Sequence, residues 1–395
     1  MAARPVGKWS WRQLVPHSEN SDRIPVPRDP WNGMLSYKNS LYLFGGAFPR
    51  YGPPRGPGDL TTLGGLNDLW QFDVKPGRWN QLEADDGLAT FDRTSTRPCG
   101  RVLPCWVETG GKFYLFGGLA VTAAGWKTRL LNDLWSFDPA TRQWTLLEPD
   151  DGRMLDRPTQ VDGQRPGTIA AMGTAVIGNR IFVYAGWGGY RRKVVLSPQL
   201  WSFDVRSKKW TLHGSGEKSG TWPSKRYCPA LTAYRSKLYL WGGRDTQDPS
   251  PQFYNDLWSY DPTTNRWRQL AATTPKPAAA TRPSARYGMG HARIGHDWYF
   301  LGGFGSERGN SPQLNDLWRL DLRSGHWSLI QAHDGSKIIG PEARRPCVRR
   351  VPAMTALDDK IYLFGGLDLT SGPNERGPLI GFNDLWSGSA VSSNQ

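Results

Sequence analysis

The side chains that stand out as candidates for binding chemistry are five arginines, each at a nearly fixed distance before a glycine pair. Four of them lie fifteen positions before the residue that directly precedes the glycine pair: Arg101, Arg226, Arg286 and Arg349. Arg28 lies one residue further back, and the third repeat has Ala170 at this position. Guanidinium groups form paired hydrogen bonds with carboxylates and phosphates. If these arginines converge, they form a funnel that selects anionic ligands.

Aromatic side chains accompany the arginines. Rings follow four of the arginines closely, and two more lie just after the third pair, which reads Ala185-Gly186. Aromatic and guanidinium groups together suit a planar or anionic ligand, whereas the alternative is that the rings only pack between neighbouring repeats. The predicted ligand-binding set is Arg28, Trp31, Arg101, Trp106, Trp187, Tyr190, Arg226, Tyr227, Arg244, Arg286, Tyr287 and Arg349.

A second interpretation of the arginines depends on a recurring tetrapeptide, Asn-Asp-Leu-Trp. The third repeat lacks the arginine, and its tetrapeptide has Gln199 in place of aspartate. It also has Ala185 where the other repeats have glycine. A joint loss indicates an ion pair within each repeat, because a buried charge that loses its partner is strongly destabilising. In this interpretation Arg226 contacts Asp256 across the glycines, and both interpretations stay open at this point.

Residues for catalysis or metal binding form weaker patterns. The six histidines show no HxH or HExxH spacing and the four cysteines show no CxxC pair, so we expect no metal and no cofactor. His291 lies on a predicted inner strand, where a hydrogen-bonded core histidine is the simpler interpretation. Cys105 and Cys228 would be reactive only if neighbouring arginines lowered the thiol pKa. Asp245 and Glu307 could act as acid or base from loops, and no catalytic residue is assigned.

The elements that position these residues are repeated along the chain. The tetrapeptide or its variant ends at six tryptophans: Trp70, Trp135, Trp201, Trp258, Trp318 and Trp386. Before each one, an apolar run ends at a glycine pair or at Ala185-Gly186, as a buried strand does when it meets a close backbone contact. A content of 46 Gly, 31 Pro and 20 Trp suits short strands joined by tight turns. Each repeat is therefore predicted to form four strands.

The last repeat lacks its closing strand. The missing sequence occurs near the N-terminus, where Trp11-Arg12-Gln13-Leu14 is identical to residues 267–270. We predict that residues 8–14 form the outer strand of the last repeat, because this closes the ring and removes a free sheet edge. A single domain over 1–395 is expected, with a flexible tail at 388–395. The six repeats are expected at 28–82, 99–147, 165–213, 224–270, 284–330 and 347–387.

These motifs resemble kelch repeats. The resemblance covers the chain from about Lys8 to Trp386 and implies an all-β fold, a six-bladed β-propeller with four antiparallel strands per blade. In such a propeller, the loops between strands two and three share one face with the connections between blades, and here both are long. Binding concentrates on variable loops that a rigid scaffold carries. The resemblance therefore places the functional surface on the long-loop face, around the central channel.

The charge of the chain suggests the kind of partner. A formal net charge of +14 favours anionic ligands, so we predict an interaction module for an acidic peptide, protein or other anionic ligand. The alternative is an enzyme of specialised metabolism or carbohydrate chemistry that uses the central pocket. The basic residues are dispersed, so no specific nucleic acid is expected. We see no secretory signal and no long apolar run, and therefore expect a cytoplasmic monomer without a membrane partner.

Overall fold

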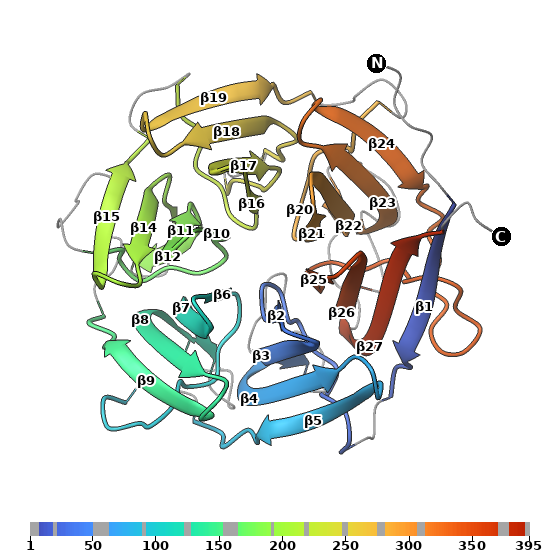
Figure 1. Ribbon diagram of the computed structural model, residues 1–395, viewed down its shortest axis with the longest axis horizontal. Coiled ribbons are helices and arrows are strands. Elements are labelled where there is room, and N and C mark those ends of the chain that lie inside the picture. The colour runs from blue at the N-terminus through green and yellow to red at the C-terminus, as the bar shows by residue number, and fades with distance from the viewer. Residues whose placement is uncertain are drawn as a thin grey trace.

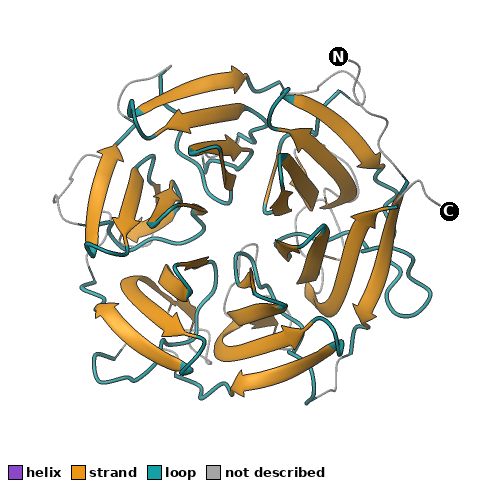
Figure 2. Ribbon diagram, in the orientation of Figure 1, coloured by secondary structure: helices purple, strands orange, loops and turns teal. Residues whose placement is uncertain are grey.

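The propeller predicted from the repeats is the fold of the chain. The computed structural model describes residues 8–18, 22–49, 63–88, 92–121, 128–152, 165–190, 193–216, 221–246, 252–274, 281–305, 313–369 and 379–391. Six antiparallel sheets surround a central axis as blades, with the first strand of each blade innermost (Figure 1). Strand is the regular structure throughout these ranges, and Figure 2 shows no helix among them. Within the same ranges, no helix is long and apolar enough to cross a membrane.

Blades 1 to 3 follow one another in chain order. Blade 1 consists of β2 (Met34–Tyr37), β3 (Ser40–Pro49), β4 (Leu63–Asp73) and β5 (Arg78–Glu83). Blade 2 consists of β6 (Cys105–Thr109), β7 (Lys112–Val121), β8 (Thr128–Asp138) and β9 (Gln143–Glu148). Blade 3 consists of β10 (Gly173–Ile177), β11 (Arg180–Tyr184), β14 (Leu200–Asp204) and β15 (Lys209–Gly214). A separate hairpin follows β11 and contains β12 (Trp187–Tyr190) and β13 (Lys193–Leu196).

Blades 4 to 6 complete the ring. Blade 4 consists of β16 (Ala230–Tyr234), β17 (Lys237–Trp241), β18 (Leu257–Asp261) and β19 (Arg266–Ala271). Blade 5 consists of β20 (Arg286–Tyr287), β21 (Gly290–Ile294), β22 (Asp297–Gly305), β23 (Gln313–Asp321) and β24 (His326–Gln331). Blade 6 consists of β25 (Ala353–Leu357), β26 (Lys360–Leu369), β27 (Leu379–Ala390) and β1 (Trp9–Val15).

The N-terminal strand closes the ring as predicted. β1 pairs antiparallel with β27, with Trp11 opposite Gly388 and Gln13 opposite Trp386. Trp11 Nε1 also donates a hydrogen bond to Gln331 Oε1 of blade 5 at 2.6 Å. β1 therefore covers the edge of β27. The prediction of a flexible tail from residue 388 is wrong at its start, because β27 continues to Ala390 and is paired with β1 there.

The segments after the glycine pairs are partly strand rather than loop. The sequence predicts long loops between strands two and three, yet in blade 1 β3 continues past the glycine pair to Pro49 and β4 begins at Leu63. The register shifts between Phe44 and Gly46, which bends both strands while they stay paired. Gly46 has a φ of 108°, and a Cβ there would lie 2.7 Å from the carbonyl oxygen of Asp29. Both the backbone angle and the close contact thus require glycine.

Aromatic clusters fill the space between neighbouring blades. Between blades 1 and 2, the ring of Phe44 lies 5.7 Å from Trp106 and 5.4 Å from Trp144, measured between ring centroids. Burying a large apolar side chain contributes roughly 1.5–3 kcal/mol, so these contacts hold each blade against the next. The rigid ring in turn fixes the start of every inner strand around the axis.

Candidate functional site

The arginines predicted to form an anion funnel lie inside the blades. Arg226 donates from Nη1 and Nη2 to the two carboxylate oxygens of Asp256, at 2.6 and 2.9 Å. Its Nη1 also donates to the carbonyl of Gly242 at 3.0 Å, and its Nε to that of Ser224 at 2.9 Å. A Cβ on Gly243 would lie 3.1 Å from Arg226 Cδ, so glycine leaves room for the arginine to cross. This is the predicted ion pair within the blade.

The same ion pair occurs in five blades. The guanidinium-to-carboxylate hydrogen bonds measure between 2.6 and 2.9 Å, and each arginine exposes at most 2% of its surface. Because these guanidinium groups bind inside the blades, the funnel that the sequence suggested does not form. We call these pairs the blade staples: Arg28–Asp68, Arg101–Asp133, Arg226–Asp256, Arg286–Asp316 and Arg349–Asp384.

The remaining residues of Asn-Asp-Leu-Trp also have structural roles. Asp256 Oδ2 accepts a second hydrogen bond from Trp258 Nε1, at 2.7 Å. Asn255 Nδ2 donates to the carbonyls of Thr274 and Pro283 at 3.2 Å, which ties down the connection to the next blade. Leu257, which lies between Asp256 and Trp258 in the tetrapeptide, is buried in the core. The tetrapeptide therefore organises the fold rather than a ligand site.

In blade 3, Ile169 occupies the position that the staple arginine has in the other blades. The carbonyl of Ile169 accepts a hydrogen bond from the Gly118 amide at 2.8 Å, as the carbonyl of Arg101 accepts one from the Gly46 amide at 3.0 Å. The expectation of Ala170 at this position is therefore wrong by one residue. An apolar side chain replaces the cation, which agrees with a loss of the whole ion pair rather than of one partner.

Gln199 takes over part of the role of the missing aspartate. Its Oε1 accepts a hydrogen bond from Trp201 Nε1 at 2.9 Å. A neutral amide can satisfy the indole without a cation beside it, so blade 3 keeps the tryptophan contact and dispenses with the staple. Ala185 adopts a φ of 59° at the position where the other blades have glycine. Ile169, Ala185 and Gln199 therefore occur together in blade 3 without leaving a buried charge unpaired.

The four cysteines are buried. The Sγ atoms of Cys99 and Cys347 accept hydrogen bonds from the staple arginine two residues later, at 3.4 and 3.3 Å. For Cys105 and Cys228, burial raises the thiol pKa instead of lowering it. A thiol in such surroundings is a poor nucleophile, so the structure gives these two cysteines no reactive role.

A second group of cations and aromatic rings lies where the inner strands begin. We call it the mouth cluster. Arg244 lies over the rings of Phe253 and Tyr287, with distances from Cζ to the ring centroid of 5.2 and 5.4 Å. Arg350 lies over Phe304 at 5.9 Å, and its Nη1 lies 3.5 Å from Tyr287 Oη. The cluster members are Tyr227, Arg244, Phe253, Tyr287, Phe304 and Arg350.

Backbone pairing positions the mouth cluster on blades 4 to 6. The residue directly after a staple arginine pairs with the residue directly after the glycine pair of the same blade. The pairs are Tyr227 with Arg244, Tyr287 with Phe304, and Arg350 with Leu367. Backbone hydrogen bonds to a second segment therefore fix the main chain at each of these residues, in the kind of rigid setting that precise recognition requires.

Three members of the mouth cluster are in the predicted set: Tyr227, Arg244 and Tyr287. Phe253, Phe304 and Arg350 were not predicted. A signal existed for Arg350, which follows a staple arginine as Tyr227 does, and for Phe304, which follows a glycine pair as Arg244 does. Phe253 lies beyond a loop of variable length, so no repeat position marks it.

Blade 1 contributes a buried acid beside the mouth cluster. Asp29 Oδ1 accepts a hydrogen bond from the Trp31 amide at 3.1 Å, and Asn32 Nδ2 donates to the Met172 carbonyl of blade 3 at 3.2 Å. Burial raises the pKa of Asp29 to about 6, although the Trp31 amide and the charge of Arg350 act in the opposite direction. Such a pKa is common at functional sites. Asp29 directly follows a staple arginine and pairs with the residue after the glycine pair, so it occupies the repeat position of Tyr227 and Arg350.

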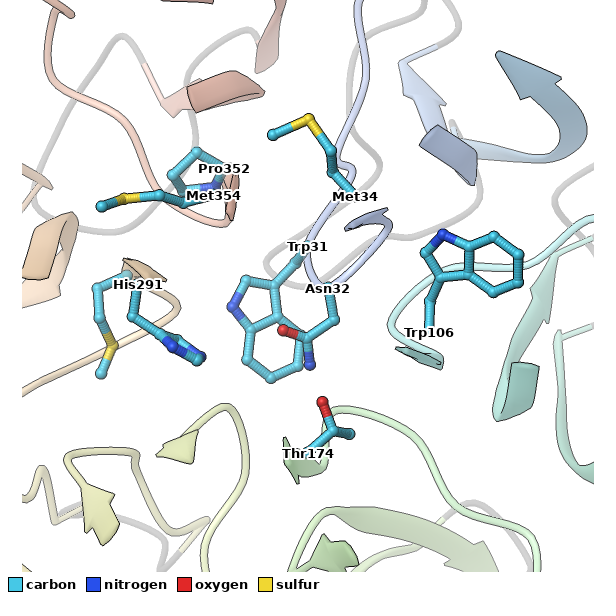
Figure 3. A pocket seen from close by; sticks show the side chains of 9 residues that line it. Trp31, Asn32, Met34, Trp106, Thr174, His291, Pro352 and Met354 are labelled. Carbon is cyan, nitrogen blue, oxygen red and sulfur yellow. The ribbon is translucent and has the colours of Figure 1, made fainter. Parts of the chain in front are cut away.

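A cavity of about 110 Å³ lies on the axis beside this loop (Figure 3). Trp31 and Trp106 line it, and Trp31 also packs in the apolar cluster that contains Tyr287 and Phe304. The cavity is well below the roughly 300–1,000 Å³ of most small-molecule sites. Its lining residues are Trp31, Asn32, Met34, Trp106, Thr174, Met289, His291, Pro352 and Met354.

His291 is the histidine that lines this cavity. Trp298 Nε1 donates to its Nδ1 at 3.4 Å, and burial lowers its pKa to about 4. The imidazole is therefore neutral at pH 7 and hydrogen-bonded, as expected for a core histidine.

At the short turns of blade 5, ligand atoms of His296, Asp297 and Asp321 lie within 4.8 Å of one another. Neighbouring arginines pair with both carboxylates there, which competes with a cation.

Of the other predicted residues, one packs near the mouth cluster. Trp187 begins β12 and pairs with Ala170, and it packs both against the apolar cluster of blades 1 and 2 and against the cluster that contains Tyr287 and Phe304. Asp245 is buried and accepts a hydrogen bond from the Gln252 amide at 2.7 Å. The side chain of Tyr190 and all of Glu307 lie outside the described residues.

Comparison with known families agrees with this geometry. The KLHDC2/KLHL20/DRC7 Kelch-repeats domain matches residues 152–366, and a Kelch motif matches residues 101–149. The chain belongs to the kelch-repeat family. Membership supports a protein-interaction module, because kelch domains generally mediate contacts between proteins.

The chain is also similar to several curated proteins. Kelch domain-containing protein 10 of Homo sapiens is 24% identical over 308 residues, which is 78% of this chain and 61% of that protein. The Leucine-zipper-like transcriptional regulator 1 homolog of Drosophila melanogaster is 26% identical over 341 residues, which is 84% of this chain and 29% of that protein. The chain thus spans less than two thirds of the length of either relative.

Proposed function

We propose that this kelch propeller binds an acidic segment of a partner protein at the mouth cluster. The observation that carries the proposal is the pair of cations around Tyr287: Arg244 lies over its ring and Arg350 lies against its hydroxyl. Both arginines are partly exposed, unlike those of the staples. The guanidinium of Arg244 is stacked on a ring, a geometry that leaves an N–H edge to face a carboxylate.

The rings of the cluster add a requirement for an apolar neighbour. Phe253 is partly exposed and lies 6.3 Å from Phe304, ring centroid to ring centroid. Aromatic residues and arginines are the side chains that contribute most to binding at protein interfaces. We therefore expect the preferred partner sequence to place an aspartate or glutamate next to an apolar or aromatic residue.

The enzyme alternative has less support. The cavity on the axis is small, and its histidine is neutral and bonded to Trp298. Asp29 has an unusual pKa, but it lies 91% buried behind the loop that carries Trp31. None of the described residues combines a nucleophile with a hydrogen-bonded base at the cavity. The predicted cytoplasmic location and monomeric state stay predictions.

Peptide selection tests the proposal without a known partner. A random-peptide phage library is selected on the purified chain, and recovered peptides are titrated by fluorescence anisotropy. We expect acidic residues beside apolar ones, and a loss of affinity of about tenfold or more in the double variant Arg244→Gln and Arg350→Gln, since each interface charge pair is worth about 1 kcal/mol or more. The control variant, Lys75→Gln and Arg78→Gln, removes the same charge from blade 1 and leaves binding unchanged.

Two results would argue against the mouth cluster. One is the recovery of peptides without acidic residues. The other is binding that responds equally to the mouth variant and to the blade 1 control, which would mean that overall charge rather than this site attracts the peptide.

A further inference from the structure

Two neighbouring blades carry an excess of positive charge on the face opposite the mouth cluster. The turns between strands one and two and between strands three and four lie on that face. In blades 3 and 4, the turns at residues 177–180, 204–209, 234–237 and 261–266 contain two carboxylates, Asp204 and Asp261. We call the turns of these two blades the basic turn face. Its seven exposed cations are Arg180, Arg206, Lys208, Lys209, Arg235, Lys237 and Arg266.

The two aspartates are already used by the turns themselves. Asp204 Oδ1 accepts hydrogen bonds from the amides of Arg206 and Ser207 at 3.0 and 2.9 Å, and Asp204 Oδ2 lies 3.6 Å from Arg180 Nε. Asp261 Oδ2 lies 3.0 Å from Lys237 Nζ. Each aspartate therefore balances one cation.

Five cations of the basic turn face remain in excess. Among the described residues, none of the five forms an ion pair: Arg206, Lys208, Lys209, Arg235 and Arg266. Seven cations against two carboxylates leave a net charge of +5 on these turns. Like charges held this close repel one another, so an anionic partner would be favoured in proportion to its charge density.

The patch is continuous across the two blades. Asn265 Nδ2 of blade 4 donates to the carbonyl of His213 in blade 3 at 2.9 Å, so their outer strands are in contact. On the inner side, Arg235 and Arg293 lie 5.3 and 6.0 Å from the ring of Tyr234, which extends the positive surface toward blade 5. Figure 1 shows blades 3 and 4 side by side.

The equivalent turns of blade 2 are balanced. They carry Lys112 and Arg142 together with Glu108 and Asp138. Lys112 Nζ lies 3.4 Å from Asp138 Oδ2. The excess charge is thus not a property of every turn in the propeller. The turns of blade 1 carry a smaller excess, with Lys38, Lys75 and Arg78 against Asp73.

We propose that the basic turn face binds an acidic segment of a second protein, separately from the mouth cluster. A protein partner fits better than nucleic acid or a membrane. The exposed large apolar side chains of the described residues, Leu270, Ile338, Ile339 and Val391, all lie outside these turns. Single-stranded nucleic acid is held by stacking on aromatic rings, and membrane surfaces by inserted apolar groups. A flexible acidic segment needs neither.

A peptide of alternating glutamate and glycine is the probe. Binding to the full chain is followed by fluorescence anisotropy over a range of salt concentrations. We expect saturable binding that weakens steadily with salt. The triple variant Arg206→Gln, Lys209→Gln and Arg266→Gln is expected to lower the affinity at least about fivefold, since exposed charge pairs contribute roughly 0.2–1 kcal/mol each. The glutamine side chains retain polarity, so the turns should fold as before.

Two matched controls separate the possible outcomes. The variant Lys75→Gln, Arg78→Gln and Lys112→Gln removes three charges from blades 1 and 2 and should leave the affinity within twofold. The mouth variant Arg244→Gln and Arg350→Gln should also leave it unchanged, since this probe carries no apolar residue. Loss of probe binding in the mouth variant alone would place the acidic ligand at the mouth, overturning this inference while supporting the proposed function.

Other outcomes also decide the question. Absence of saturable binding contradicts the inference. Tighter binding of double-stranded DNA, or of vesicles that contain phosphatidylserine, with the same loss in the triple variant, assigns the patch to another class of partner and rejects the protein segment. These results leave the phage selection on the mouth cluster unaffected, so the two proposals can fail independently.

Discussion

At the scale of single residues, neighbouring arginines in this propeller have opposite roles. Arg349 is fully buried and bound to Asp384, whereas Arg350, the next residue, is partly exposed in the mouth cluster. Adjacent residues of an extended chain point to opposite sides, so one reaches into the blade and the other faces the axis. The repeat marks the structural arginine, and the candidate ligand contact lies one position later.

Breaking one staple should cost much more than removing both partners. Arg226→Ile leaves Asp256 buried without its cation, and we expect a loss of about 3–5 kcal/mol in the free energy of unfolding. The double variant Arg226→Ile and Asp256→Gln copies the blade 3 residues Ile169 and Gln199. Because it leaves no buried charge unpaired, its loss should be smaller than the sum of the single losses by at least about 1 kcal/mol.

Urea unfolding measures these differences. Arg268→Met, on an exposed position of β19, serves as the control and should change stability by less than about 0.5 kcal/mol. Strictly additive losses in the double variant would show that Arg226 and Asp256 do not stabilise each other.

Asp29 should make stability fall as the pH rises from about 4 to about 6. Its pKa in the folded chain is about 6, above the ordinary value of 3.8, so the folded state holds the proton more tightly than the unfolded state. Folding therefore loses this contribution as pH rises through the interval, by an amount on the order of 3 kcal/mol. Asp29→Asn keeps an acceptor for the Trp31 amide and removes the titration.

The test compares unfolding of the wild type and Asp29→Asn at pH 4 and pH 7. The stability of the variant relative to the wild type should rise between these two values. Parallel pH profiles for the two proteins would mean that Asp29 has an ordinary pKa in the folded state.

At the scale of elements, the features that can be predicted from the sequence are those that recur from repeat to repeat. The apolar runs, glycine pairs and Asn-Asp-Leu-Trp tetrapeptides recur, so the blades, the closing strand and the Arg226–Asp256 contact could be predicted. Features that occur once could not. Phe253 follows a loop without a repeat, and the burial of the carboxylate of Asp29 is particular to blade 1, although Asp29 itself stands at a repeat position. The one-residue error at Ile169 was one of counting, because the residue fifteen positions before Tyr184 is Ile169 rather than Ala170.

Removal of the closing strand should expose a sheet edge. Without residues 1–15, β27 loses its partner β1, and the contact between Trp11 and Gln331 is lost as well. An unpaired edge strand favours association with other chains. We expect aggregation or dimerisation in size-exclusion chromatography with light scattering, together with a lower urea midpoint.

The matched control removes residues 1–7 alone, which lie before β1. It should remain indistinguishable from the full chain. An unchanged midpoint and unchanged mass for the chain without residues 1–15 would show that ring closure by β1 contributes little.

At the scale of the whole molecule, two surfaces of different chemistry lie at opposite ends of the axis. The mouth cluster combines two arginines with four aromatic rings, while the basic turn face carries five cations in excess and is bordered by the ring of Tyr234 beneath Arg235. Salt should therefore affect them differently. Binding at the basic turn face depends mainly on screened charges, whereas stacking at the mouth cluster persists at higher salt.

The difference in salt response can be measured on the two probes side by side. Between low and physiological salt, the affinity of the glutamate–glycine peptide should fall more steeply than that of a phage-selected peptide. Equal salt dependence would indicate that both peptides bind one surface by charge alone.

The central claim is that the five staple arginines are structural and that the cations of the mouth cluster contact the ligand. Nuclear magnetic resonance of the arginine Nε–H groups tests it directly, with a phage-selected peptide as ligand. We predict that the Arg244 and Arg350 resonances shift on addition of the peptide, while those of Arg28, Arg101, Arg226, Arg286 and Arg349 stay in place and remain protected from exchange. Shifts in the staple resonances with no change at Arg244 and Arg350 would contradict the account.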